Sequence, residues 1–138
     1  MSAEELFAGF DEAKQAEYEQ EIEAKYGGKL LNESRRNWSR YTAADKERIK
    51  QEGGAVYRDL VRLIHADPAS PEVQAVMARW HQNIRHFYEP SREVLRGLGQ
   101  MYAEHPDFIV TFTRLHPDLP EFLRRATEVY AETAVVNA

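Results

Sequence analysis

The stretch WHQNIRHFYEPSREVLRGLGQMY, residues 80–102, decides the fold of this chain. Pro90 divides it, because proline cannot donate a backbone hydrogen bond and disfavours helical geometry at the preceding Glu89. On each side of Pro90, apolar residues recur every three or four positions, which is typical of one face of an α-helix. They are Val73, Val76, Met77, Trp80, Ile84, Phe87 and Tyr88 before the break, and Val94, Leu95, Leu98, Met101 and Tyr102 after it. The stretch therefore predicts a helix ending at Glu89 and a second helix capped by Ser91, which meet at a corner with aromatic walls.

Caps, prolines and glycine pairs delimit the other helices. Thr42 and Asp45 have the spacing of a capping box, and Asp118 and Glu121 repeat that spacing. Ser70 followed by Pro71 is typical of a helix start, with serine as the cap and proline in the first turn. The glycine pair at 53–54 falls inside a long helix, where it indicates either a kink or the close approach of another backbone. With the two helices of the corner, about seven helices are expected, the others at about residues 11–26, 30–40, 42–66, 106–115 and from 118 onward.

Composition bounds the class of protein. The chain has 138 residues, of which 43% are apolar, so it is long enough for a single compact all-α domain spanning residues 1–138. It contains no cysteine, which excludes disulfides, thiolate metal sites and a cysteine nucleophile. No apolar run approaches the roughly 18–20 residues of a membrane span, so a cytoplasmic location without membrane contact is expected. The net charge is −5 and no basic stripe interleaves with aromatics, so direct nucleic-acid binding by this chain is not expected.

The N-terminal region differs from the rest in charge and in apolar content. Residues 1–28 hold eight carboxylates and two lysines, a net charge of 2 − 8 = −6. Their helical stripe is thin, consisting of Tyr18, Ile22 and Tyr26, and so short a seam anchors a helix weakly. We therefore expect mobile N-terminal helices over residues 1–40 and a helical core over residues 41–138.

The polar residues offer little catalytic chemistry. The five histidines form no metal-binding motif, and the carboxylates sit at caps and solvent faces, so neither an enzyme nor a bound cofactor or metal is expected. Haem on one histidine is a minor alternative. The aromatic residues, 11% of the chain, form either plain core or a cleft for a flat or apolar ligand. A protein-interaction groove that takes an amphipathic helix from a partner is the alternative from another functional class.

The run FYEPSREVLRGLGQMYAEHPDF, followed by LHPDLPEFLRRATEVY, resembles the C-terminal half of the TipAS antibiotic-recognition domain. That domain is the effector part of some MerR-type transcription activators and also occurs alone. The resemblance extends back through NESRRNWSRYTAADKERI to YEQEIEAKYGG. It implies a globin-like helical fold without haem, and a cleft that senses or sequesters thiopeptides or other large apolar natural products.

The resemblance and the aromatic pattern together nominate the binding residues. Where some members carry a cysteine that captures the drug, this chain has Pro90, so reversible binding is expected; Tyr26 stands where a tryptophan is usual. The cleft is expected beside the corner, and N-terminal aromatics are expected to close over the ligand. The candidate ligand-binding residues are Tyr26, Trp38, Tyr41, Trp80, His81, Ile84, Phe87, Tyr88, Tyr102, Phe108 and Phe112.

Overall fold

The computed structural model describes residues 28–134, and this part of the chain contains helices and no strand. The expected all-α class is confirmed. Six helices are described where about seven were expected; the helix expected at 11–26 lies outside the described residues, as does the candidate Tyr26. The helices are α3 (Gly28–Arg40), α4 (Ala43–Arg62), α5 (Pro71–Ile84), α6 (Arg92–Glu104), α7 (Pro106–Leu115) and α8 (Leu119–Thr133).

Three helix starts follow the caps that the sequence predicts. The Thr42 hydroxyl accepts from the Asp45 N–H at 3.1 Å while the Asp45 carboxylate accepts from the Thr42 N–H at 3.0 Å, which completes the capping box of α4. Ser70 and Ser91 cap α5 and α6. The prediction of a capping box at Asp118 is wrong. The Asp118 side chain makes no capping bond, and the backbone N–H of Asp118 donates to Nδ1 of His116.

Two helices end earlier than expected. α4 stops at Arg62, not near Ala66, because the next N–H groups bond three residues back, as in the tighter turns that often close helices. α5 stops at Ile84, not at Glu89. Two carbonyls beyond Ile84 accept hydrogen bonds from side chains in or next to α3. Tyr41 donates to His86 O, and Asn37 donates to Phe87 O. Those partners are 45 and 50 residues away in sequence, so no local pattern could indicate them.

The helix α4 continues through the glycine pair, and a side chain approaches the first of the two glycines. α4 runs unbroken from Ala43 to Arg62, and the group that approaches Gly53 is the side chain of Asn83. A Cβ built on Gly53 would lie 3.2 Å from Asn83 Oδ1, while Asn83 Nδ2 donates to Ile49 O at 2.9 Å. The glycine therefore lets one amide side chain tie α5 to α4.

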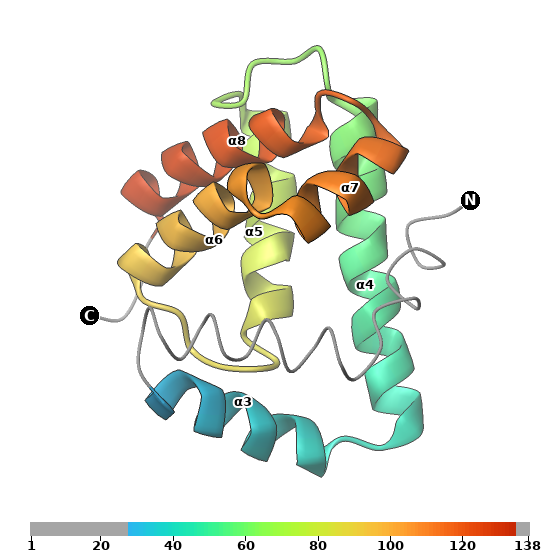
Figure 1. Cartoon of the computed structure of the whole chain (residues 1–138), viewed down its shortest axis with the longest axis vertical. Helices are drawn as coiled ribbons and strands as arrows, with labels where there is room; N and C mark the ends of the chain where they lie inside the picture. Colours follow the sequence, from blue (N-terminus) through green and yellow to red (C-terminus); the bar gives the residue numbers. More distant parts are fainter. Residues whose placement is uncertain (1–27, 135–138) are drawn as a thin grey trace.

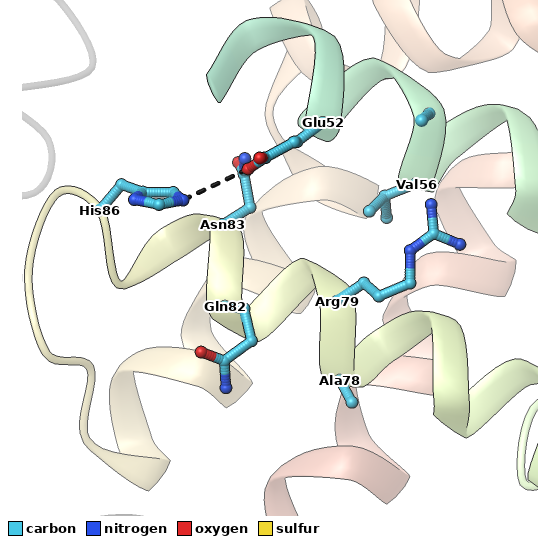
Figure 2. A pocket seen from close by; sticks show the side chains of 8 residues that line it. Glu52, Val56, Ala78, Arg79, Gln82, Asn83 and His86 are labelled. Carbon is cyan, nitrogen blue, oxygen red and sulfur yellow. Dashed lines mark hydrogen bonds and ion pairs between the residues drawn. The ribbon is translucent and has the colours of Figure 1, made fainter. Parts of the chain in front are cut away.

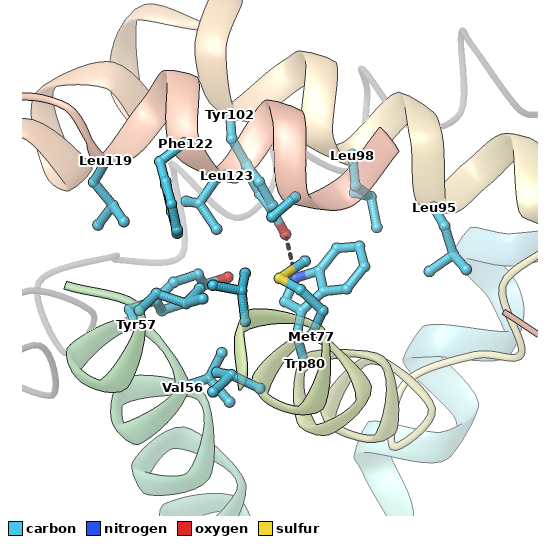
Figure 3. Packing of buried hydrophobic residues seen from close by; sticks show 14 of the residues in the cluster. Val56, Tyr57, Met77, Trp80, Leu95, Leu98, Tyr102, Leu119, Phe122 and Leu123 are labelled. Atoms are coloured by element: carbon cyan, nitrogen blue, oxygen red, sulfur yellow. Dashed lines mark hydrogen bonds between the residues drawn. The ribbon is translucent and has the colours of Figure 1, made fainter. Parts of the chain in front are cut away.

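The helices form two crossed groups with α3 at one end (Figure 1). α4 and α5 pack side by side, and α6, α7 and α8 lie across them. α6 and α8 share the largest helix interface, where Gly99 faces Thr127. Figure 3 shows the core between the groups, where α4 and α5 meet α6 and α8. α3 runs below the others, beside the α5–α6 linker, residues 85–91. Within residues 28–134, no helix has the length and apolar character needed to cross a bilayer.

Candidate functional site

A half-buried group of aromatic rings joins α3 to the α5–α6 linker. Trp38 stacks on Phe87 with ring centroids 5.1 Å apart and planes 20° apart. The Tyr41 ring meets the Trp38 ring edge-on, with centroids 6.1 Å apart. The ammonium of Lys46 lies 5.2 Å from the centroid of the Trp38 ring. Offset stacks and cation–π contacts both stabilise such groups. We call Trp38, Tyr41 and Phe87 the aromatic cluster; all three rings remain partly open to solvent.

Two hydrogen bonds fix the cluster through the linker backbone. The Tyr41 hydroxyl donates to His86 O at 2.6 Å, and Asn37 Nδ2 donates to Phe87 O at 2.8 Å. These bonds hold α3 and Tyr41 to the linker at His86 and Phe87. Phe87 also supplies the ring that stacks on Trp38. The linker backbone and the ring of Phe87 are therefore the direct partners of Asn37, Trp38 and Tyr41.

The other aromatic candidates lie in the core. Trp80 is 2% exposed and donates through Nε1 to the Tyr102 hydroxyl at 3.2 Å (Figure 3). Burial raises the pKa of Tyr102, and the hydrogen bonds with Trp80 and Tyr57 partly offset that shift. Phe112 is fully buried and Tyr88 almost so. The structure thus fills the space behind the helix corner with these rings, so it brings them together as packing and not as walls of an open cleft.

Ile84 and Phe108 are intermediate in exposure, unlike the buried rings of the core. Both pack against the core, and Phe108 stacks on Phe112 at 6.0 Å.

His81 is buried, although histidine is an intermediate case for burial. Its Nδ1 shares a hydrogen bond of 2.7 Å with the Tyr130 hydroxyl, whereas its buried Nε2 has no partner among the described residues. Burial lowers the pKa of the imidazole; the nearby charge of Glu89 raises it and that of Arg85 lowers it further. His81 is therefore a neutral link between α5 and α8 near neutral pH.

Sequence reasoning missed a hollow of about 530 Å³ on the surface between α4 and α5 (Figure 2). Two pairs of residues close its ends: Glu52 of α4 with His86 of the linker at 3.3 Å, and Asp59 of α4 with Arg79 of α5 at 2.6 Å. Apolar residues and two amides line the space. We call it the ladder hollow; it is lined by Glu52, Ala55, Val56, Ala78, Arg79, Gln82, Asn83 and His86.

A signal for the ladder hollow was present in the sequence. Glu52 and Asp59 are seven residues apart, as are Arg79 and His86, so each pair repeats after two helical turns. Ala55 falls between Glu52 and Asp59, and Ala78 immediately precedes Arg79. Only the antiparallel pairing of α4 with α5, which the sequence does not state, turns these spacings into two rungs.

The described residues gather no three histidine or carboxylate side chains at one point, as a protein metal site requires. The chemistry on offer is stacking, apolar contact and hydrogen bonding. Such a set can hold a ligand without a reaction.

The chain is similar in sequence to parts of two bacterial transcription regulators. It is 28% identical over 137 residues to the HTH-type transcriptional activator mta of Bacillus subtilis, an alignment covering 96% of this chain and 53% of that protein. It is also 28% identical over 138 residues to the HTH-type transcriptional regulator SkgA of Caulobacter vibrioides, covering 95% and 54% respectively. The chain thus spans about half the length of the curated relatives it matches.

A solved structure and a family model agree with each other. The fold matches TipAS, from a thiopeptide antibiotic multidrug resistance system of Streptomyces lividans, solved in complex with nosiheptide. The TM-score is 0.76 at 26% identity, and the match covers 93% of this chain and 90% of that one. The model of the TipAS antibiotic-recognition domain matches residues 18–130, most of the chain. The chain therefore belongs to the TipAS antibiotic-recognition domain family.

Proposed function

We propose that this chain binds a bulky, largely apolar antibiotic of the thiopeptide kind and so senses or sequesters it. The observation that carries the proposal is the match, over nearly the whole chain, to TipAS solved with nosiheptide, together with family membership. Binding alone suffices for both roles. A held drug is withdrawn from its target, and a drug that prefers one conformation shifts the protein toward it.

The aromatic cluster is the part of the candidate site best placed to meet a ligand. Trp38, Tyr41 and Phe87 are partly exposed, so a flat heteroaromatic group can stack on them without unfolding anything. Trp80, Tyr88 and Tyr102 would reach a ligand only through an opening of the core, because each is less than a tenth exposed. Their role in binding, like that of His81, Phe108 and Phe112, stays a prediction.

We also propose that residues 1–40 close over the bound drug. Trp38 of α3 stacks on Phe87, Asn37 of α3 donates to Phe87 O, and Tyr41, just after α3, donates to His86 O. Each of these two hydrogen bonds contributes about 1 kcal/mol, so a ligand that offers equivalent contacts can replace them at low cost. We expect amide exchange across residues 32–40 to slow when the drug binds; unchanged exchange would contradict closure by α3.

Binding is proposed to be reversible and to involve no reaction. The chain has no thiol, and Pro90 cannot act as a nucleophile. In the cell we place the chain in the cytoplasm, as the effector part of a transcription regulator or as a binding protein, without direct contact to DNA. The regulatory half of this proposal rests on the named relatives, of which the chain spans about half.

Calorimetric titration with nosiheptide tests the proposal, with an amphipathic helical peptide titrated in parallel. We expect saturable heat with nosiheptide alone, and mass spectrometry after denaturation should recover unmodified protein. Heat with the peptide alone would favour a protein-interaction groove over antibiotic recognition. A stable adduct would contradict reversible binding.

A further inference from the structure

The ladder hollow has the dimensions of a ligand site. Pockets that bind small molecules typically enclose about 300–1,000 Å³, and this one encloses about 530 Å³. Its two rungs are Glu52 with His86 and Asp59 with Arg79, and Glu52 and Asp59 are seven residues apart on α4. At about 1.5 Å per residue, the space between the rungs is about 10 Å long, the length of two or three fused or linked aromatic rings.

Small residues make the hollow, and the packing behind it keeps it open. Ala55 and Ala78 line the hollow with only a methyl group each, and Val56 contributes a buried apolar side chain. Between Arg79 and His86, the amides of Gln82 and Asn83 complete the lining. Asn83, bonded to Ile49 O and lying against Gly53, holds α5 at this distance from α4. The hollow is therefore preformed, because neither helix can move inward without breaking these contacts.

One charged side chain of the hollow is placed to bind an anion. Arg79 lies at the edge of the hollow beside its partner Asp59. The Arg79 side chain is 50% exposed and uses only Nη1, which donates to Asp59 Oδ2 at 2.6 Å; its other N–H groups have no partner among the described residues. Guanidinium groups bind carboxylate and sulfonate oxygens through such free N–H pairs.

We propose that the ladder hollow is a second binding site, separate from the aromatic cluster, for an organic anion with a flat apolar body about two helical turns long. The rings would lie over Ala55 and Ala78 and the anionic group would meet Arg79 (Figure 2). This inference does not depend on antibiotic binding, and its test contains no antibiotic.

The probe is anilinonaphthalene sulfonate, titrated into the full chain by fluorescence and by amide chemical shifts. Ala78→Leu should fill the hollow and lower affinity by at least about tenfold. Ala75→Leu is the matched control, since Ala75 is also an exposed alanine on α5 but does not line the hollow. In the unmodified protein, the largest shifts should fall at residues 53–56 and 78–83. Equal affinity of the two leucine variants, or shifts confined to other helices, would overturn the proposal.

Neutral N-phenylnaphthylamine, which has the same rings without the sulfonate, tests the role of charge. Arg79→Gln should weaken the sulfonate probe by about fivefold, the worth of one exposed charge pair, and leave the neutral probe unchanged. Equal effects of Arg79→Gln on both probes would show that the site does not select an anion.

Discussion

The molecule contains two aromatic groups of similar composition that are built in opposite ways. Around Trp80 and Tyr102 the rings are buried, pack on one another and satisfy their polar atoms internally. In the aromatic cluster of Trp38, Tyr41 and Phe87 the rings are partly exposed, and the polar atom of Tyr41 is tied to a linker carbonyl. The first arrangement holds the fold together, whereas the second can exchange its contacts for those of a ligand.

The largest difference between the two groups should appear on removing one ring from each. Phe112→Ala removes a fully buried ring and should lower the free energy of unfolding by about 3–5 kcal/mol. Phe87→Ala removes a half-buried ring and should cost about 1–2 kcal/mol, mainly the stack on Trp38. Urea unfolding monitored by circular dichroism measures both. Equal losses would mean that the aromatic cluster is as much a part of the core as Phe112.

Glycine substitutions separate tight packing from an adaptable contact. A Cβ on Gly99 would lie 2.5 Å from Thr127 Cβ, and Thr127 is fully buried and bonded to Leu123 O. Gly99→Ala should therefore lower stability by about 1–3 kcal/mol despite the better helix propensity of alanine. Gly53→Ala meets only the end of the Asn83 side chain at 3.2 Å, so its effect should be near zero. If Gly99→Ala proved neutral in thermal unfolding, the α6–α8 interface would be looser than the structure shows.

The buried histidine gives the core a dependence on pH. His81 has a lowered pKa in the folded chain, so the unfolded chain binds more protons just below the ordinary value of about 6.5. Stability should be complete above about pH 6.5 and fall as pH decreases from there toward the folded pKa. His81→Gln should flatten this part of the curve, while His65→Gln, at an exposed ring, should retain it. A parallel decline in His81→Gln and wild type would assign the effect to other groups.

The smallest expected change concerns the bond between Tyr41 and the linker. Tyr41→Phe removes the hydroxyl that donates to His86 O and should cost about 1 kcal/mol. Ser39→Ala, which removes an exposed local bond to Arg36 O on the same helix, should cost almost nothing. Amide exchange at residues 32–40 should accelerate in Tyr41→Phe alone; equal exchange in the two variants would show that this bond does not hold α3.

Much of the fold could be predicted because its signals are local. The caps at Thr42, Ser70 and Ser91 and the helix Pro106–Leu115 lie where the sequence indicates. The early end of α5 could not be predicted, since the donors to the carbonyls that follow it come from Asn37 and Tyr41.

The candidate site was less accessible to sequence reasoning. Periodicity finds the buried face of a helix, and the same periodicity nominated Trp80 and Tyr102, which the structure places in the core. Trp38 and Phe87 differ from them in exposure, a property of tertiary packing. The ladder hollow depends on the pairing of α4 with α5, so Glu52 and His86 carry no meaning until that pairing is known.

The central claim is that a drug meets the exposed aromatic cluster and leaves the buried one in place. The chain has two tryptophans, so Trp80→Phe reports on Trp38 alone and Trp38→Phe reports on Trp80 alone. Titrated with nosiheptide, the protein that retains Trp38 should show a large saturable fluorescence change, and the protein that retains Trp80 a small one with weakened affinity. A large change at Trp80 together with unaltered affinity in Trp38→Phe would contradict this account and place the antibiotic in an opened core.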